Sequence, residues 1–420
     1  MNKSSSIVTG NNYSQPNRPL PISLFNAFGR FTEKLGFTNK LDMHRLIASA
    51  KKKSGLSDFG DEWFFEPLQV LVDAINNEAN LTPLGKLIQR QRLIDALIVR
   101  LRVEQLYKEN PQIDDLEFGK IVVIAGLQRT GTTTLHRLLA ADPKVRSLLS
   151  WEALNPVPLP NEVQGKPEQR IKKALQAEKG LAYLAPEFFA IHPVEHDAPE
   201  EDILLLDLSF MSQAPEATLH VPSYAKWLES QDHTKAYAYL RRVMKLLQWQ
   251  NPAPNWVLKT PHHMEYLDVL IDVFPEAVVV QTHRDPQKTT GSFCSMVAHG
   301  RGVFSDDVDA KEVASHWVKK VGKLMQDSIN VRDAQGDDRF IDVSYYDLLE
   351  NPEQEVKRIY DFAGIEFNQS VMDKVVATKN KNVQHRFGKH KYDIADFGLT
   401  KESIEAEYQF YRERYAIPFE

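Results

Sequence analysis

Four short apolar runs, each followed by a longer segment with helical spacing, constrain the fold of this chain more than any other feature. The runs occupy residues 121–125, 256–259, 277–282 and 340–343. Strands that are apolar on both faces are typical of parallel sheets covered by helices on both sides. Right-handed crossovers connect such strands through the intervening helices. The pattern therefore predicts an α/β fold with a P-loop-like parallel sheet of four to five strands.

Helical patterns precede this series and interrupt it. Residues 1–20 are rich in Ser, Asn and Pro and are predicted to form a mobile tail, and residues 21–115 to form an N-terminal helical region packed on the core. Thr82, placed to cap a helix, marks the start of the clearest helix in that region. The α/β domain is then expected at 116–420, with a helical insertion at 146–250.

Composition excludes several classes of protein. With 420 residues, 42% hydrophobic and 26% charged, the chain is globular, and no apolar run reaches the roughly 18 residues of a membrane helix. The formal charge of −6 provides no positive field for nucleic acid or an anionic membrane. One cysteine, Cys294, and the absence of a secretion signal indicate a reducing compartment. We expect a cytoplasmic protein without nucleic-acid or membrane partners.

The segment after the first strand has the composition of an anion-binding loop. It reads Gly126-Leu127-Gln128-Arg129-Thr130-Gly131-Thr132-Thr133-Thr134 and opens a helix. Glycines let the backbone approach an anion, the helix N-terminus faces it, and the hydroxyls add donors. The spacing also fits the P-loop of nucleotide triphosphatases, but Thr132 replaces the required lysine and the cation is Arg129 instead. A kinase using ATP and magnesium is therefore the alternative.

Two further cations follow later strands. Arg284 comes after the run at 277–282, and Ser292 lies eight residues beyond it. A guanidinium at a strand end binds phosphate in a bidentate manner, and a hydroxyl two turns into the next helix can donate to the same oxygens. Lys259 ends another strand within Leu258-Lys259-Thr260-Pro261. From these residues alone, a capping ion pair is the alternative for Arg284, and an ordinary surface lysine is the alternative for Lys259.

These motifs resemble those of sulfotransferases that use 3′-phosphoadenosine-5′-phosphosulfate (PAPS). In that family a loop of cation, Ser or Thr, Gly, Thr, Thr binds the 5′-phosphosulfate, and an Arg–Ser pair binds the 3′-phosphate. The resemblance covers about residues 118–366 and is closest to the bacterial and tyrosylprotein branches. It implies the following PAPS-binding residues: Gln128, Arg129, Thr130, Gly131, Thr132, Thr133, Thr134, Arg284, Ser292, Arg386 and Lys391.

The chain departs from the family pattern at three places. Thr134 stands where the cytosolic branch stacks adenine on a tryptophan, so the adenine partner is unassigned. The basic segment that contains Arg386 and Lys391 is the nearest analogue of the family's C-terminal Arg-Lys-Gly, with a solvated loop as the alternative. The family's short dimerisation motif is absent from the sequence, which leaves the oligomeric state open.

Sulfonate transfer requires a base for the acceptor's proton and cations where charge develops. Arg129 and Lys259 are the expected cations, and no metal is required. Glu152 resembles the catalytic glutamate that follows the loop helix in the bacterial and tyrosylprotein branches, and it is the first candidate for the base. His263 lies beside the position of the base histidine in the cytosolic branch and is the second.

Two other patterns have interpretations that require no metal or catalytic role. The run His192-Pro193-Val194-Glu195-His196 matches an inverted zinc-protease motif, but Pro193 is incompatible with the helix that would align both histidines. The acidic residues between Glu195 and Asp202 are predicted to start a helix at 203–211, because carboxylates favour a helix N-terminus. Alternatively, some of them face the acceptor and favour a cationic one.

The resemblance therefore implies a sulfotransferase that moves a sulfonate group from PAPS to a hydroxyl or amine of a small organic acceptor. The helical insertion would shape the acceptor pocket. The rival functions are the ATP- and magnesium-dependent kinase and a non-catalytic protein that binds the nucleotide.

Overall fold

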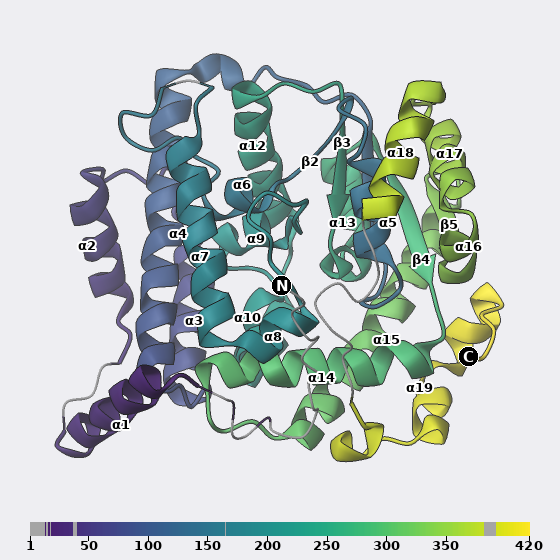
Figure 1. Cartoon of the computed structure of the whole chain (residues 1–420). Helices are drawn as coiled ribbons and strands as arrows, with labels where there is room; N and C mark the ends of the chain where they lie inside the picture. The colour runs from purple at the N-terminus through teal and green to yellow at the C-terminus, as the bar shows by residue number, and fades with distance from the viewer. Residues whose placement is uncertain (1–12, 14–15, 17, 37–39, 164, 382–391) are drawn as a thin grey trace, which may run out of the picture.

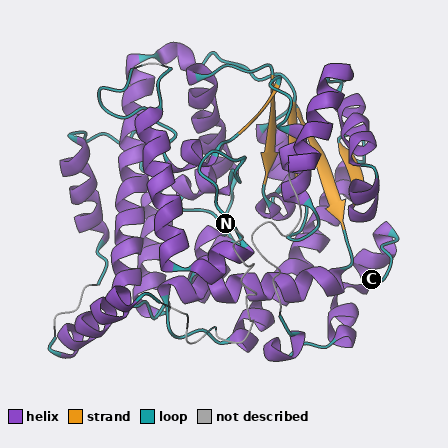
Figure 2. Ribbon diagram, viewed as in Figure 1, coloured by secondary structure: helices purple, strands orange, loops and turns teal. Residues whose placement is uncertain are grey.

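The computed structural model describes residues 13, 16, 18–36, 40–163, 165–381 and 392–420 (Figure 1). Five parallel strands form one sheet in the order β2-β3-β1-β4-β5. They are β1 Ile121–Ile124, β2 Val145–Ser147, β3 Asn255–Lys259, β4 Ala277–His283 and β5 Phe340–Ser344. The predicted α/β class is confirmed, and Figure 2 shows the strands enclosed by helices. The edge strand β2 was not predicted from the sequence, because it is only three residues long.

Helices surround the sheet on every side. Those before β1 are α1 Leu20–Lys34, α2 Met43–Ser54, α3 Phe65–Asn77, α4 Pro83–Glu109 and the 3₁₀ helix η1 Pro111–Ile113. Those between β1 and β3 are α5 Thr132–Leu139, α6 Ser150–Leu154, α7 Glu168–Leu184, α8 Pro186–Ile191, α9 Ile203–Leu206, η2 Asp207–Ser209, α10 Ala214–Thr218, α11 Pro222–Leu228 and α12 Thr234–Gln250. Those after β3 are η3 Pro261–Glu265, α13 Leu267–Val273, α14 Pro286–Phe304, α15 Ala310–Gln335, α16 Tyr345–Glu350, α17 Pro352–Ala363, α18 Gln369–Lys381, η4 Ile394–Phe397 and α19 Lys401–Tyr415. No helix in these ranges combines the length and the apolar character needed to cross a membrane.

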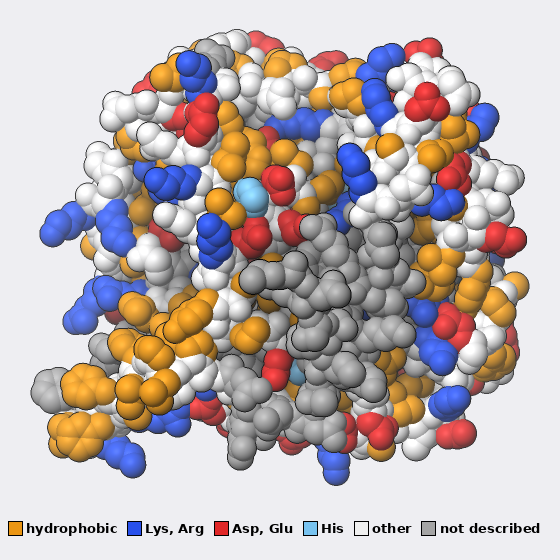
Figure 3. All heavy atoms as spheres, in the orientation of Figure 1, with side chains coloured by type: hydrophobic (Ala, Val, Ile, Leu, Met, Phe, Trp, Pro, Cys, Tyr) orange, Lys and Arg blue, Asp and Glu red, His pale blue; other side chains and the backbone are white. Residues whose placement is uncertain are grey.

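The helices before the sheet form the left side of the molecule in Figure 1. The Thr82 hydroxyl accepts a hydrogen bond from the Gly85 amide at 3.0 Å, which caps α4 as predicted. Tyr13, within the predicted tail, is buried and its hydroxyl lies 3.0 Å from Ser295 Oγ on α14. That part of the tail is therefore anchored. Helix α1 projects from the body, and Figure 3 shows hydrophobic side chains gathered over it.

Two apolar cores lie on opposite faces of the sheet. Alternate residues of β1 point to each side, so that Ile121 and Val123 join the larger core and Val122 and Ile124 join the smaller one. The larger core includes side chains from α3, α4, α12 and α15, and the smaller one includes α5, α17 and α18. The N-terminal helices therefore share their core with one face of the sheet.

The carboxyl ends of β1 and β4 approach each other closely. A Cβ atom added to Gly126, just after β1, would lie 2.0 Å from the Oγ1 of Thr282 in β4. Only a residue without a side chain fits there, since carbon atoms cannot approach an oxygen so closely. This contact brings the loop after β1 beside the segment after β4.

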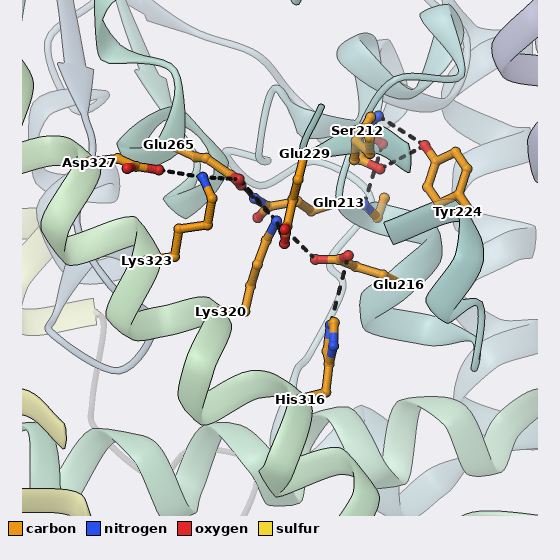
Figure 4. Close-up of polar contacts among 12 residues, drawn as sticks. Ser212, Gln213, Glu216, Tyr224, Glu229, Glu265, His316, Lys320, Lys323 and Asp327 are labelled. Carbon is orange, nitrogen blue, oxygen red and sulfur yellow. Dashed lines mark hydrogen bonds and ion pairs between the residues drawn. The ribbon is translucent and has the colours of Figure 1, made fainter. Parts of the chain in front are cut away.

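A buried group of charged residues joins α10, η3 and α15 (Figure 4). Lys320 Nζ lies 2.8 Å from carboxylate oxygens of both Glu229 and Glu265 and 3.9 Å from Glu216. Glu216 is fully buried, and neither of its carboxylate oxygens accepts a hydrogen bond from any residue in the described ranges. Burial raises the pKa of Glu216 to about 7.

We predict that Gly126→Ala destabilises the protein by about 1 to 3 kcal/mol, the usual cost of overpacking a tight contact. Urea unfolding measures the change. Gly180→Ala in α7 is the control, because nothing lies within 4 Å of the added Cβ. That control should gain up to about 1 kcal/mol from its higher helix propensity. Equal stability of Gly126→Ala and wild type would contradict the close approach.

We also predict that Glu216→Gln changes how stability depends on pH. The folded-state pKa of Glu216, about 7, exceeds its ordinary value of 4.5, so the wild type loses stability as pH rises through 7. The glutamine variant has no such loss. Its melting temperature relative to wild type should therefore be higher at pH 8 than at pH 5, by roughly 1 to 3 °C. The exposed Glu117→Gln should show no such difference, and a flat difference for Glu216→Gln would refute the prediction.

Candidate functional site

The loop after β1 has the backbone shape of an anion cradle. Gly131 has φ +88° and Arg129 has φ +69°, both in the left-handed region, and Gly131 is the residue before α5. A side chain at Gly131 would also meet Leu348 and Tyr345 at 3.1 Å. Successive turns of this kind point backbone N–H groups toward one concave side, as in other phosphate-binding loops. The predicted strand, loop and helix are all present.

The threonines of the loop differ in orientation. Thr130 is buried, and its hydroxyl donates to Leu127 O at 2.6 Å and lies 2.6 Å from Thr282 Oγ1. Thr130 therefore ties the loop to β4. Thr132, the first residue of α5, is buried, whereas Thr133 and Thr134 are exposed at the start of the same helix.

Arg129 and Arg284 bring the two predicted phosphate positions together. The Arg284 guanidinium donates to the backbone carbonyl of Arg129 at 3.0 Å and lies 3.9 Å from the centre of the Tyr345 ring. Desolvation by surrounding protein atoms, followed by the nearby Arg284 charge, lowers the pKa of Arg129. Both groups remain protonated at neutral pH, because an arginine pKa starts far above it. Two arginines therefore lie close together at this edge of the sheet, as an anion site requires.

A carboxylate of the protein itself lies against Arg284. Glu420 accepts two hydrogen bonds from its guanidinium, at 2.7 and 3.1 Å, and a third from Tyr346 at 3.1 Å. This bidentate geometry is the one that a phosphate would adopt on arginine. Ser292, the other predicted phosphate ligand, is buried in α14.

Lys259 ends β3 beside the end of β1. Its backbone pairs in register with Ile124, and its side chain is buried. The ammonium lies 2.5 Å from Glu201 Oε1, and the backbone N–H donates to Asp202 Oδ1 at 2.9 Å. Two consecutive acidic residues therefore contact Lys259: Glu201 contacts its side chain and Asp202 contacts its backbone.

The segment that carries these acids runs alongside the end of β2. The Glu200 N–H donates to Leu148 O at 2.8 Å, and Leu149 forms a bridge with Pro199. Burial, strengthened by the adjacent Glu201 carboxylate, raises the pKa of Glu200. Glu200 and Glu201 are partly exposed, beside Lys259. The acidic run was visible in the sequence, but its pairing with Lys259 depends on tertiary structure.

The predicted helix at 203–211 is shorter than expected. Helix α9 ends at Leu206 and is followed by the 3₁₀ turn η2, after which Phe210 has φ +57°. A bulky residue in that conformation ends the helix. Glu195, at the other end of the acidic run, forms an ion pair with Arg137 at 2.6 Å.

Glu152, the first candidate for the base, lies in a buried ion pair with Arg146. It also accepts from the Leu149 amide at 3.1 Å, which caps α6. Arg146 donates to the carbonyls of Leu247 and Asn251 and lies 4.4 Å from the centre of the Trp256 ring. These contacts fasten α6 to α12, and they occupy the Glu152 carboxylate.

His263, the second candidate, is fully buried in η3. Its ring lies between the Asp202 carboxylate and the Tyr237 hydroxyl, each at 2.8 Å. Burial raises the pKa of Asp202, but the His263 charge and hydrogen bond outweigh it and lower the pKa overall. His263 therefore holds the segment that carries Glu201 against the sheet.

The other residues singled out in the sequence lie in different parts of the structure or outside the described residues. Gln128 is partly exposed beside Arg129. Arg386 and Lys391 lie outside the described residues. Helix α8 ends at Ile191, so the run that begins at His192 has no helix on which to align two histidines.

Two solved structures resemble most of this fold. The sulfotransferase STF1 from Mycobacterium tuberculosis is 32% identical and superposes with a TM-score of 0.77, over 88% of this chain and 99% of that protein. The sulfotransferase STF9 from Mycobacterium avium is 26% identical with a TM-score of 0.82, over 91% and 99% of the two chains. The P-loop-like α/β class is therefore that of known sulfotransferases.

A curated relative and a family model agree with this. The omega-hydroxy-beta-dihydromenaquinone-9 sulfotransferase Stf3 of Mycobacterium bovis and M. tuberculosis is 24% identical over 259 residues, which is 58% of this chain and 62% of the relative's length. The chain thus matches less than two thirds of that relative. The model described as "Sulfotransferase family" matches residues 122–369, from β1 to the start of α18. Because this match covers more than half of the chain, the chain belongs to the sulfotransferase family.

Proposed function

We propose that this protein transfers a sulfonate group from PAPS to a hydroxyl group of a small organic acceptor. The hydrogen bond from Arg284 to the carbonyl of Arg129 carries the proposal, because it places two cationic phosphate sites side by side. PAPS has negative groups at both its 5′ and 3′ positions, so it needs two such sites. A nucleoside triphosphate needs only one, together with the P-loop lysine that Thr132 replaces.

The loop and the two arginines have separate roles in this proposal. The backbone amides of Gly131 to Thr134, with Gln128 and Arg129, bind the 5′-phosphosulfate. Arg284 and Ser292 bind the 3′-phosphate, which displaces the Glu420 carboxylate from the guanidinium. The exchange is reasonable because both groups present two coplanar oxygens, whereas phosphate carries the larger charge. Arg386 and Lys391, which lie outside the described residues, stay predicted ligands.

The transfer itself is an in-line substitution at sulfur. The acceptor oxygen forms a bond to sulfur while the bond from sulfur to the bridging phosphate oxygen breaks, and 3′-phosphoadenosine-5′-phosphate leaves. Lys259 stabilises the charge that develops on the bridging oxygen, and Arg129 the charge on the sulfonate oxygens. These cations belong to the chain, so the proposed step requires no metal.

We propose Glu200 as the base that takes the acceptor's proton. Its raised pKa brings it nearer to neutral pH than an ordinary glutamate, which suits proton transfer. It is partly exposed beside the pair of Lys259 and Glu201, whereas Glu152 and His263 are buried in contacts with other residues. Glu201 then orients Lys259 before the donor binds.

A hydroxyl acceptor is favoured over a cationic one. Three of the five carboxylates in the acidic run lie in ion pairs, Glu195 with Arg137, Glu201 with Lys259 and Asp202 with His263. The name of the relative Stf3 describes a hydroxylated menaquinone derivative as its substrate, which also supports a hydroxyl acceptor. An amine remains chemically possible at the same site, because sulfur is attacked by nitrogen in the same way.

Labelled PAPS tests the donor directly. Turnover with PAPS and a panel of hydroxyl and amine acceptors, in the presence of a chelator, is the expected result. Phosphoryl transfer from ATP with magnesium instead would identify the kinase. Tight binding of PAPS without transfer to any acceptor would identify the non-catalytic nucleotide-binding protein.

We predict that Arg284→Ala weakens the binding of 3′-phosphoadenosine-5′-phosphate by about 2 to 4 kcal/mol, because it removes one side of a charge pair. Calorimetry measures the affinity. Glu420→Gln should strengthen binding severalfold, since the competing carboxylate loses its charge. Arg414→Ala, which removes a surface pair with Asp333, is the control and should bind like the wild type. Unchanged affinity in Arg284→Ala would reject the 3′-phosphate assignment.

We predict that Glu200→Gln lowers turnover by about 100- to 10,000-fold with nucleotide affinity nearly unchanged. Because the pKa of Glu200 is raised, wild-type turnover should fall with acid at a pH above the ordinary glutamate value of 4.5, and the variant should lose this inflection. Lys259→Ala should also depress turnover. Glu152→Gln and His263→Asn should mainly lower the melting temperature. If Glu200→Gln is fully active and Glu152→Gln is folded but inactive, then Glu152 is the base that takes the acceptor's proton.

A further inference from the structure

Helix α1 packs against the body of the protein through its polar face. The Asn26 side chain accepts a hydrogen bond from the Leu84 amide at the start of α4, at 3.0 Å. Gly29 packs so tightly on Pro83 that an added Cβ would lie 2.5 Å from the proline ring. Glu33 pairs with Lys86 on α4 at 2.6 Å. These contacts fix which face of α1 points away from the protein.

The outward face of α1 is apolar, as the cluster at the lower left of Figure 3 shows. Its large side chains recur every third or fourth position and are mostly exposed: Leu20 71%, Leu24 62%, Phe25 46%, Phe28 68%, Phe31 59% and, just after the helix, Leu35 61%. Surface helices normally have the reverse arrangement, with the apolar face inward. A contiguous apolar patch of this kind marks an interaction surface.

Cations border this apolar face. A groove of about 370 Å³ runs along α1 and is lined by Arg18, Arg30 and Lys34 together with Phe31. Arg18 and Arg30 share one carboxylate, that of Asp306, and half of the Arg30 side chain is exposed. The groove therefore has three positive charges beside one negative charge. It combines basic groups with an aromatic ring at the edge of an apolar surface.

We propose that α1 is a peripheral membrane-binding helix that lies on a bilayer surface containing anionic phospholipids. The leucines and phenylalanines would enter the boundary between head groups and acyl chains, as in other interfacial amphipathic helices. Arg30 and Lys34, which line the groove beside this face, would pair with lipid phosphates. The net charge of −6 does not oppose this, because only the charges near the bilayer act on it. The proposal does not depend on the transfer reaction.

The same charges disfavour a second copy of the chain as the occupant. In a two-fold dimer the same patch lies on both sides of the interface. Arg30 and Lys34 of one copy would then lie near those of the other copy, and like charges repel. An anionic lipid surface has the complementary charge.

Vesicle co-sedimentation tests the proposal with the full chain. The wild type should bind phosphatidylcholine vesicles that contain phosphatidylglycerol, bind pure phosphatidylcholine more weakly, and lose affinity as salt rises. The double variant Leu24→Ser, Phe28→Ser should lower the partition coefficient by about tenfold or more. The matched control is Leu349→Ser, Phe362→Ser, which removes the same two residue types from exposed positions on α16 and α17. Melting temperatures should stay near the wild-type value, because all four side chains are exposed.

Three results would overturn the proposal. The first is no binding of the wild type to anionic vesicles at low salt. The second is equal binding by the α1 variant and its control. The third is a wild-type dimer, seen by sedimentation velocity, that dissociates when Leu24 and Phe28 are replaced, which would assign the surface to a second copy. Lys34→Glu should weaken binding to anionic vesicles severalfold, and an unchanged salt dependence in that variant would remove the electrostatic part of the argument.

Discussion

The close contact between the ends of β1 and β4 determines the geometry of the whole site. Gly126 leaves room for Thr282, and Thr282 in turn lies within hydrogen-bond distance of Thr130 in the loop. The loop is therefore attached at its middle to the neighbouring strand. Because the next residues of β4 lead to Arg284, the two arginines have a nearly fixed separation before any ligand binds. Preorganised cations of this kind avoid the cost of rearrangement when charge develops.

The sequence was sufficient to predict the fold because its strands are buried on both faces and therefore apolar throughout. Ile121 to Ile124 is one uninterrupted apolar run, whereas β2, with Arg146 at its centre, has no such signal. The loop and Arg284 were also found, since their motifs are local. The pairing of Glu201 with Lys259 was not, because 58 positions separate the two residues. Only the course of the chain past β2 brings them together.

Glutamates of this chain show how environment divides one residue type among roles. Glu152 has a cation and a backbone amide as partners, so it stabilises a turn of helix. Glu216 is buried beside a lysine that two other carboxylates already hold closely, and it retains a proton near neutral pH. Glu200 lies between these extremes, partly exposed and next to a carboxylate that is itself paired. Sequence position alone distinguishes none of the three.

Helix α14 connects two regions that are far apart in the sequence. Ser292 and Ser295 lie within one turn of it, and the second contacts the hydroxyl of Tyr13. The Tyr13 ring also packs edge-on against His299, one further turn along. A helix moves as a rigid unit, so any rotation of α14 that brings Ser292 toward a bound phosphate also moves the residues against which Tyr13 packs. Tyr13, which precedes α1 in the sequence, is thereby linked through α14 to the position of Ser292.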